Sequence, residues 1–193
     1  MVTGAGVGIG FALCRAFAQA GAKVVLNDLD TRLAQFAAQK INDELQTESV
    51  IAYGFDVADV AAIRKTVDEV GIRFGRLDVM IANAGITNYG PFLDYTPEAF
   101  DRLSNVNLRG SYFTAQAAAR TMIAHKCAGR ILLMSSVTGV QAFMNLGAYG
   151  ITKAAQMQMA RNWQAEAAKT GPRVLVLTPQ PMPTATRARH YPG

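Results

Sequence analysis

Tyr149 and Lys153 stand four residues apart, directly after a loop and at the start of a long helical pattern. Four residues of helix place two side chains on one face, with their Cβ atoms about 5–6 Å apart. A phenol with a pKa of about 10 exchanges protons poorly at neutral pH, but a fixed ammonium group beside it favours the phenolate and lowers that pKa. We therefore expect Lys153 to lower the pKa of Tyr149 and the pair to transfer a proton. An aromatic residue at a helix entry and a solvated surface lysine would give the same pattern.

A glycine-rich turn near the start of the chain has a second chemical use. Gly4, Gly8 and Gly10 follow the short apolar segment 1–2 and precede a helical pattern over residues 11–20. Glycines let the backbone approach a phosphate group closely, and a helix N-terminus adds unpaired N–H groups and a positive dipole. We expect this turn to bind the phosphates of a dinucleotide, and a turn without a ligand is the alternative.

An acidic residue, Asp28, ends the next apolar strand and lies 18 residues after Gly10. In dinucleotide-binding folds a carboxylate at this position accepts hydrogen bonds from the adenosine ribose and repels a 2′-phosphate, so we expect NAD rather than NADP. A surface turn residue or a helix cap is the alternative reading of Asp28. A phosphate loop is excluded because no lysine or hydroxyl follows Gly10 directly, and a methyltransferase would leave the tyrosine and lysine unexplained.

The rest of the chain supplies the elements that must position these groups. Six short apolar strands alternate with helical patterns, which is typical of an α/β protein with a parallel sheet. The continuous apolar character of the strands indicates that helices cover both faces. We predict a single doubly wound, Rossmann-like domain over residues 1–193, with three α/β/α layers and ligands at the carboxyl ends of the strands. The strands are expected at 1–2, 23–28, 50–57, 77–82, 130–136 and 173–178, and the helices at 11–20, 31–48, 60–74, 96–125 with a kink near 107–110, and 149–169.

Composition and charge exclude several classes of function. Of the 193 residues, 50% are apolar and 17% are charged, and the net charge of +5 comes from scattered basic residues, so we expect no nucleic-acid partner. Cys14 and Cys127 lack a C-x-x-C spacing and the two histidines lie far apart, which argues against a metal site and fits a reducing compartment. No apolar run reaches membrane-spanning length and no leader pattern precedes the first strand, so we expect a cytoplasmic protein without a membrane partner.

Taken together, the motifs resemble those of the short-chain dehydrogenase/reductase family, and the resemblance covers almost the whole chain. Thr3-Gly4-x-x-x-Gly8-Ile9-Gly10 looks like the cofactor loop of that family, and Asn83-Ala84-Gly85 looks like its motif after the fourth strand. Ser136 precedes the Tyr149-x-x-x-Lys153 pattern by 13 residues, as the family serine does. By this resemblance the catalytic residues are Asn107, Ser136, Tyr149 and Lys153. The cofactor-binding residues are Gly4, Gly8, Ile9, Gly10, Asp28, Asp56, Val57, Asn83, Gly85, Tyr149, Lys153 and Thr184.

The resemblance implies an oxidoreductase that exchanges a hydride between NAD(H) and a small-molecule secondary alcohol or ketone. Tyr149 would be the general base in oxidation and the general acid in reduction. Ser136 would hold and polarise the substrate oxygen, while Lys153 would lower the tyrosine pKa and bond the nicotinamide ribose. Asn107 would position a water that relays the proton to solvent. Ser135 could exchange roles with Ser136 if the register slipped by one residue.

Two departures from the family pattern leave a second function open. Only Met1 and Val2 precede the Thr-Gly motif, so the first strand should lose ladder hydrogen bonds and core side chains, and the chain ends nine residues after Thr184, before the expected substrate lid. The alternative is a truncated, catalytically weak or silent relative that binds a dinucleotide as a regulatory or scaffold protein. A serine hydrolase is disfavoured because no G-x-S-x-G motif is present. The resemblance also implies a homo-oligomer, a dimer or a tetramer.

Overall fold

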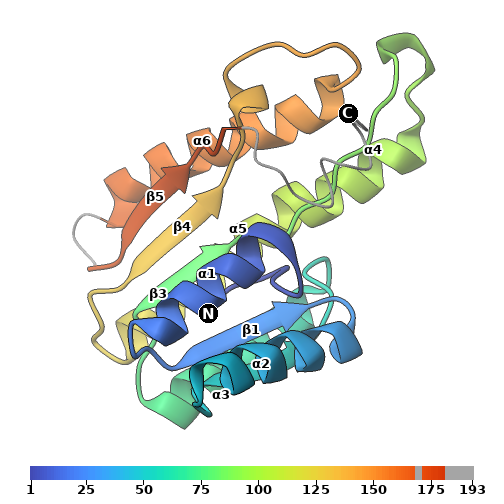
Figure 1. Ribbon diagram of the computed structural model, residues 1–193. Helices are drawn as coiled ribbons and strands as arrows, with labels where there is room; N and C mark the ends of the chain where they lie inside the picture. Colours follow the sequence, from blue (N-terminus) through green and yellow to red (C-terminus); the bar gives the residue numbers. More distant parts are fainter. Residues whose placement is uncertain (168–170, 181–193) are drawn as a thin grey trace.

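The computed structural model describes residues 1–167 and 171–180, which form an α/β fold with parallel strands (Figure 1). The predicted fold class is confirmed. The strands are β1 (Val24–Asp28), β2 (Val50–Gly54), β3 (Val79–Ala82), β4 (Arg130–Met134) and β5 (Arg173–Leu177). The α-helices are α1 (Gly8–Gln19), α2 (Thr31–Leu45), α3 (Val60–Phe74), α4 (Pro97–Ser104), α5 (Ser111–Ala124) and α6 (Gly147–Ala167), and the shorter turns are η1 (Phe92–Asp94), η2 (Asn105–Gly110) and η3 (Val137–Gly139).

Val2 joins two groups of parallel strands into one sheet. β1 pairs with β2, while β3, β4 and β5 pair in that order. Val2 forms parallel bridges to Leu26 in β1 and to Ile81 in β3, so the strand order is β2-β1-Val2-β3-β4-β5. Its N–H donates to Val25 O at 2.9 Å, and the Ile81 N–H donates to Met1 O at 2.9 Å. The short first segment therefore has ladder bonds on both sides, and the strand order reverses there.

Helices cover both faces of this sheet through two apolar clusters. On one face, α1 and α2 bury Cys14 and Ile41 against Leu26. On the other face, α3, α5 and α6 pack in a second cluster that includes Val67 and Met122. Figure 1 shows α1 in front of the sheet and α5 behind it. The predicted three-layer arrangement follows, because each buried strand presents side chains to both faces.

Several predicted boundaries are wrong by a few residues. α1 begins at Gly8 instead of residue 11, because the last glycines of the turn already form its first turn. The strands expected over 50–57 and 130–136 end at Gly54 and Met134, so the polar residues that follow lie in loops. α6 begins at Gly147, two residues before the predicted start.

The kink predicted near residues 107–110 is a π-helical turn. η2 interrupts the helical segment between α4 and α5 over residues 105–110. Thr96 caps α4 by accepting a hydrogen bond from the Ala99 N–H at 3.2 Å, with Pro97 in the first turn. Single π-turns inside helices often lie at functional sites, and this one carries Asn107.

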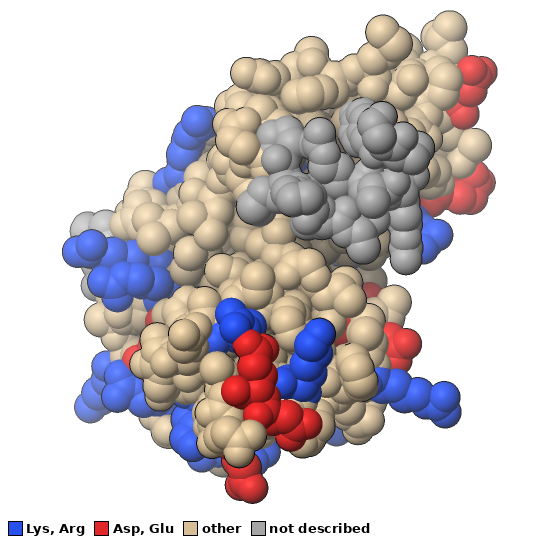
Figure 2. Space-filling model, in the orientation of Figure 1, with Lys and Arg blue, Asp and Glu red and all other residues tan. Residues whose placement is uncertain are grey.

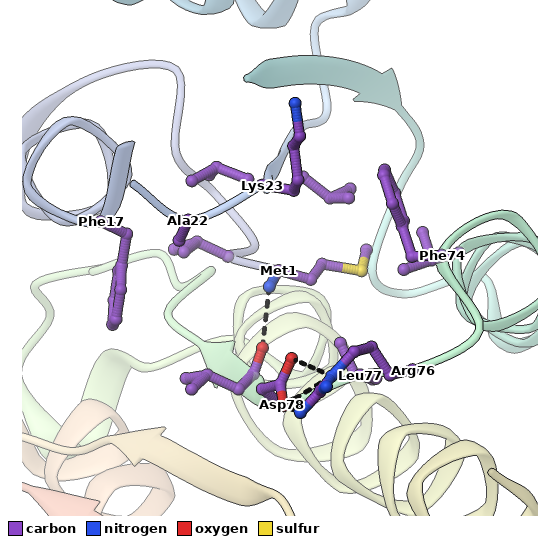
Figure 3. A pocket seen from close by; sticks show the side chains of 13 residues that line it. Met1, Phe17, Ala22, Lys23, Phe74, Arg76, Leu77 and Asp78 are labelled. Atoms are coloured by element: carbon purple, nitrogen blue, oxygen red, sulfur yellow. Dashed lines mark hydrogen bonds and ion pairs between the residues drawn. The ribbon is translucent and has the colours of Figure 1, made fainter. Parts of the chain in front are cut away.

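A cavity of about 280 Å³ lies beside Met1, where β1 and β3 begin. Its walls are mainly apolar and include Phe17, Phe74 and Leu77 (Figure 3). The Met1 ammonium donates to Val79 O at 2.8 Å, and burial lowers its pKa to about 6. Because this cavity lies at the amino ends of the strands, it is distant from the edge where a doubly wound fold binds its ligand.

Basic and acidic side chains are interspersed on the face shown in Figure 2. Arg15 of α1 and Glu44 of α2 form an ion pair. Within residues 1–167 and 171–180, no helix combines the length and the apolar character needed to cross a membrane. The same described residues hold no group of three or more His, Cys, Asp or Glu side chains suited to a metal ion.

Candidate active site

The loops at the carboxyl ends of β1, β3 and β4 lie along one edge of the sheet. Asp28 ends β1, residues 83–85 follow β3, and Ser136 follows β4. Parallel strands end at the same edge of a sheet, so the predicted site residues gather on one side of the molecule. Thr184 lies outside the described residues.

Thr3 and Asn83 hold the glycine turn against the loop after β3. Thr3 Oγ1 accepts hydrogen bonds from the N–H groups of Asn83 and Ala84, both at 3.1 Å. Asn83 Nδ2 donates to the carbonyl oxygens of Thr3 and Gly4, both at 2.9 Å. Gly4 has a φ of +60°, and a Cβ there would lie 2.6 Å from Ala84 Cα, so a side chain does not fit. Asn83 therefore shapes the turn through its side chain.

The first turn of α1 presents backbone N–H groups at the same edge. Gly8, Ile9 and Gly10 form this turn, and among the described residues no side chain caps it. A Cβ on Gly10 would lie 2.6 Å from Asn83 Nδ2, so the helix packs directly on the loop after β3. Unpaired N–H groups and the positive end of the helix dipole suit an anion such as a phosphate.

The Asp28 carboxylate lies against the glycine turn. Its Oδ2 accepts from the Gly6 N–H at 2.9 Å, and its Oδ1 accepts from the Asp30 N–H at 3.3 Å. The cap of α2 is Asp30, which accepts from two N–H groups of the first turn, so the helix-cap reading of Asp28 is wrong. Beyond β2, Asp56 is exposed and accepts from the N–H two residues later at 2.8 Å, whereas Val57 is buried.

The expectation that Lys153 lowers the pKa of Tyr149 is wrong for this structure. Burial raises the pKa of Tyr149 above its ordinary value, and hydrogen bonding to Ser136 and Thr87 offsets only part of the rise. Lys153 Nζ lies 5.5 Å from the centroid of the Tyr149 ring, over its face. An ammonium in that place interacts with the π-electrons of the ring, so it stabilises the phenolate oxygen less than a direct contact would.

Lys153 is buried, with 3% of its surface exposed, so the surface-lysine reading is wrong. Its Nζ donates to Met134 O at 2.7 Å and to Gln156 Oε1 at 3.2 Å. Burial lowers the pKa of Lys153 to about 8. A Cβ on Gly85 would lie 3.5 Å from Nζ, so Gly85 lies next to the ammonium.

Asn107 pairs with the backbone of the loop after β3. Its Oδ1 accepts from the Ile86 N–H at 2.8 Å, and its Nδ2 donates to Ile86 O at 2.9 Å and to Thr152 Oγ1 at 3.2 Å. Asn107 has 0% of its surface exposed. The side-chain amide is thus engaged with Ile86 and Thr152, and the main-chain oxygen of Asn107 accepts from Gln156 Nε2 at 2.8 Å.

The two adjacent serines have different roles. Ser135 is buried and donates to Lys153 O at 2.8 Å, which ties β4 to α6. Ser136 is half-buried, accepts from the Thr138 N–H at 3.3 Å and interacts with the Tyr149 phenol. The hydroxyl that faces the phenol is therefore that of Ser136, as the predicted register requires.

Three polar residues of this site were not predicted from the sequence. Thr87 hydrogen-bonds to the Tyr149 phenol, and Thr152 Oγ1 donates to Tyr149 O at 2.8 Å. Gln156 is fully buried and accepts from Lys153. Gln156 follows Tyr149 by seven residues and Lys153 by three, so helical spacing could have placed it on their face. No spacing marks Thr87.

The comparison with protein families places these motifs in one family. A family model described as short chain dehydrogenase matches residues 1–192. Versicolorin reductase stcU of Emericella nidulans is 43% identical over 140 residues, which are 72% of this chain and 51% of that protein. The chain thus spans about half the length of that curated relative.

Solved structures share the fold over nearly the whole chain. Gluconate 5-dehydrogenase from Burkholderia cenocepacia J2315, in complex with NADP and tartrate, is 34% identical with a TM-score of 0.90, over 97% of this chain and 72% of that chain. NAD+-bound xylitol dehydrogenase is 31% identical with a TM-score of 0.87, over 93% and 68%. Because one of these complexes holds NADP and the other NAD+, the similarity leaves the cofactor preference open.

Proposed function

Because this chain belongs to the short-chain dehydrogenase family of oxidoreductases, which bind nicotinamide dinucleotides, we propose that it transfers a hydride between NAD(H) and a secondary alcohol or ketone. The observation that carries this proposal is the surroundings of the Tyr149 phenol. Ser136 and Thr87 hydrogen-bond to it, and the buried Lys153 ammonium lies 5.5 Å from its ring. In such a place the phenol can exchange a proton with a substrate oxygen. The hydroxyl can donate a hydrogen bond to the same oxygen, and the cation can stabilise the negative charge.

The residues present fit a bound dinucleotide. The first turn of α1, which no side chain of the described residues caps, offers N–H groups to the phosphates. Asp28 lies beside the glycine turn, where its carboxylate can accept hydrogen bonds from the adenosine ribose. We propose that a ribose hydroxyl reaches Lys153 Nζ on the side of Gly85, whose Cβ would lie 3.5 Å from that atom. When bound, the nicotinamide ring supplies or accepts the hydride at the substrate carbon.

In ketone reduction, Tyr149 gives its phenolic proton to the substrate oxygen while the substrate carbon gains the hydride. Ser136 donates a hydrogen bond to the same oxygen and stabilises its developing negative charge. Lys153 supplies a positive charge close to the phenolate that remains. In alcohol oxidation the phenolate takes the hydroxyl proton and the hydride leaves the carbinol carbon, so protons and electrons balance in both directions.

We propose NAD as the preferred cofactor because of Asp28. Its carboxylate is fixed beside the glycine turn by the Gly6 N–H at 2.9 Å. A negative charge held at this place repels the 2′-phosphate of NADP and can accept hydrogen bonds from the free hydroxyls of the NAD ribose.

The loops that border Tyr149 favour an uncharged, apolar substrate. The Gly90 N–H donates to Asn145 O at 3.0 Å, which joins the loop after β3 to the loop before α6. Residues 137–149 carry no charged side chain. The loop after β3 carries one exposed carboxylate, Asp94, which would repel a phosphate. We therefore expect ketones and alcohols with apolar substituents in preference to sugar phosphates. The exposed apolar side chains of the two loops are Phe92, Leu93, Val140, Phe143 and Met144.

The test is Tyr149→Phe, which removes the proton-transfer hydroxyl and keeps the ring. NADH binding, followed by cofactor fluorescence, should be unchanged, while turnover of secondary alcohols should fall by about 10²–10⁴-fold, the usual contribution of general acid–base catalysis. Equal turnover by wild type and variant would refute the assignment of Tyr149. Binding of NADH without turnover of any alcohol or ketone by the wild type would favour a dinucleotide-binding protein without catalysis.

A further inference from the structure

Gln156 is a polar side chain in the buried face of α6, with 0% of its surface exposed. Its neighbours on that face include Met157 and Ala160, which are also buried. A buried amide is costly unless each of its polar atoms has a hydrogen-bond partner. The Gln156 amide therefore needs hydrogen-bond partners in the folded protein, and residues of the candidate active site provide them.

The Gln156 amide joins three elements. Its Nε2 donates to the main-chain oxygen of Asn107 in η2 at 2.8 Å and to Ser111 Oγ in α5 at 2.7 Å. Its Oε1 accepts from Lys153 Nζ at 3.2 Å. The reverse orientation of the amide would set its NH₂ group against an ammonium and its oxygen against a carbonyl oxygen. Only one orientation is compatible with these partners.

We propose that Gln156 is a positioning residue of the candidate active site, whose amide ties the Lys153 ammonium to the Asn107 main-chain carbonyl and to Ser111. Lys153 has three protons on Nζ, and Met134 O and Gln156 Oε1 accept two of them. Gly85 lies next to Nζ, because a Cβ built on Gly85 would be 3.5 Å from that atom. Gln156 Oε1 and Met134 O thus fix the directions of two of the three protons.

The same contact keeps the lysine charged. Burial alone favours the neutral amine, and a carbonyl oxygen that accepts from Nζ favours the ammonium. Among the described residues, Lys153 is met by Met134 of β4, by Gln156 of its own helix and by the ring of Tyr149, and none of these contacts is a carboxylate. Gln156 and Met134 O are therefore the polar groups that oppose its deprotonation.

Asn107 was expected to position a water that relays the proton to solvent. In the structure the connection between the Asn107 carbonyl and Lys153 Nζ runs through one amide group. Because the Gln156 amide is part of the chain, it holds the Asn107 carbonyl and Lys153 Nζ at a fixed separation without an ordered water. The Gln156 side chain therefore sets the spacing between η2 and α6.

The first test measures the protonation of Lys153 without any need for turnover. The chain has six lysines, so ¹³C-lysine labelling gives few signals, and loss of one signal in Lys153→Arg assigns it. Gln156→Met removes the acceptor, and the pKa of Lys153 should fall by about 1 or more, the value of one charge-assisted hydrogen bond. Gln156→Glu places a carboxylate beside Nζ and should raise that pKa.

Gln158 provides the matched control, because it is an exposed glutamine on the same helix that donates to Asn162 Oδ1 at 2.9 Å. Gln158→Met and Gln158→Glu should leave the Lys153 pKa at its wild-type value. The proposal is overturned if neither Gln156 variant changes the lysine titration, or if the Gln158 variants change it equally. Should Gln156→Met fail to fold, the Gln156→Glu titration decides alone.

The second test rests on the proposed function and uses turnover. In Gln156→Met the alkaline limb of the kcat profile should move to lower pH by the same amount as the Lys153 pKa, with the substrate KM changed less than twofold. In Gln156→Glu that limb should move to higher pH. If the Lys153 pKa shifts as expected but the protein has no turnover, the proposed function is refuted and the positioning role of Gln156 is supported. A shifted lysine pKa with an unshifted kcat profile would overturn the role of Gln156 in catalysis.

Discussion

Asn107→Leu removes the amide that pairs with Ile86 and keeps a side chain with the same branching and the same number of heavy atoms. In the wild type, Asn107 Oδ1 accepts from the Ile86 N–H at 2.8 Å and Nδ2 donates to Ile86 O at 2.9 Å. The variant leaves both backbone groups of Ile86 without a side-chain partner. Thr152 loses less, since its hydroxyl still donates to Tyr149 O at 2.8 Å.

The expected loss of stability follows from these two groups. A buried donor or acceptor without a partner costs about 1–3 kcal/mol, and Ile86 is half-buried, so water can reach part of it. We therefore expect Asn107→Leu to lower the free energy of unfolding by about 2–4 kcal/mol. At about 2–4 °C per kcal/mol for a chain of this size, Tm should fall by about 4–16 °C.

Urea unfolding followed by circular dichroism measures this difference. Asn105→Leu is the matched control, because Asn105 lies in the same π-helical turn and is exposed. It should change the free energy of unfolding by less than about 0.5 kcal/mol. A loss below about 1 kcal/mol in Asn107→Leu, close to the net value of one ordinary hydrogen bond, would show that the pairing with Ile86 contributes little.

Three further perturbations test other contacts of the site. Thr3→Val leaves the N–H groups of Asn83 and Ala84 without an acceptor and should cost about 2–4 kcal/mol in urea unfolding, whereas Thr3→Ser, which keeps the hydroxyl, should cost less. Since the pKa of Lys153 falls from 10.5 to about 8 on folding, the folded protein binds fewer protons than the unfolded chain between those values, and stability rises with pH there. Relative to Lys153→Met, the free energy of unfolding of the wild type should therefore rise by about 2 kcal/mol from about pH 7.5 to about pH 10. If the unfolding free energies of the two proteins change in parallel with pH, the burial of a titrating amine is contradicted. Asp28→Ser should raise the NADPH affinity relative to NADH by at least about fivefold in fluorescence titrations, because one pair of like charges at about 4 Å costs about 1 kcal/mol even in water; an unchanged ratio would remove Asp28 from the proposed cofactor preference.

Much of the fold could be predicted because it depends on local patterns. Runs of apolar residues locate the strands, and the alternation of strands with helices implies a parallel sheet. Glycine spacing also located the turn at Gly4 and Gly10, since a positive φ or a close backbone approach excludes other residues there. These features need no knowledge of distant contacts.

The electrostatic character of the site could not be predicted in this way. Helical spacing puts Tyr149 and Lys153 on one face, but it does not tell how deeply each is buried. In the structure burial dominates, so the pKa of Tyr149 is raised and that of Lys153 is lowered. Similarly, the pairing of Asn107 with Ile86 joins residues 21 apart in sequence, and a sequence pattern contains no signal for such a contact.

The π-helical turn η2 contains one residue more than the α-helical turn that it replaces, because a π-turn closes i→i+5 hydrogen bonds and an α-turn closes i→i+4 bonds. Removal of one residue from 105–110 would therefore let this segment close as an ordinary α-helix. Ala115, Ala118 and Met122 of α5 would still pack on the sheet. The extra residue thus serves the placement of Asn107 and not the packing of α5, so a single deletion here should disturb the pairing of Asn107 with Ile86 more than the fold.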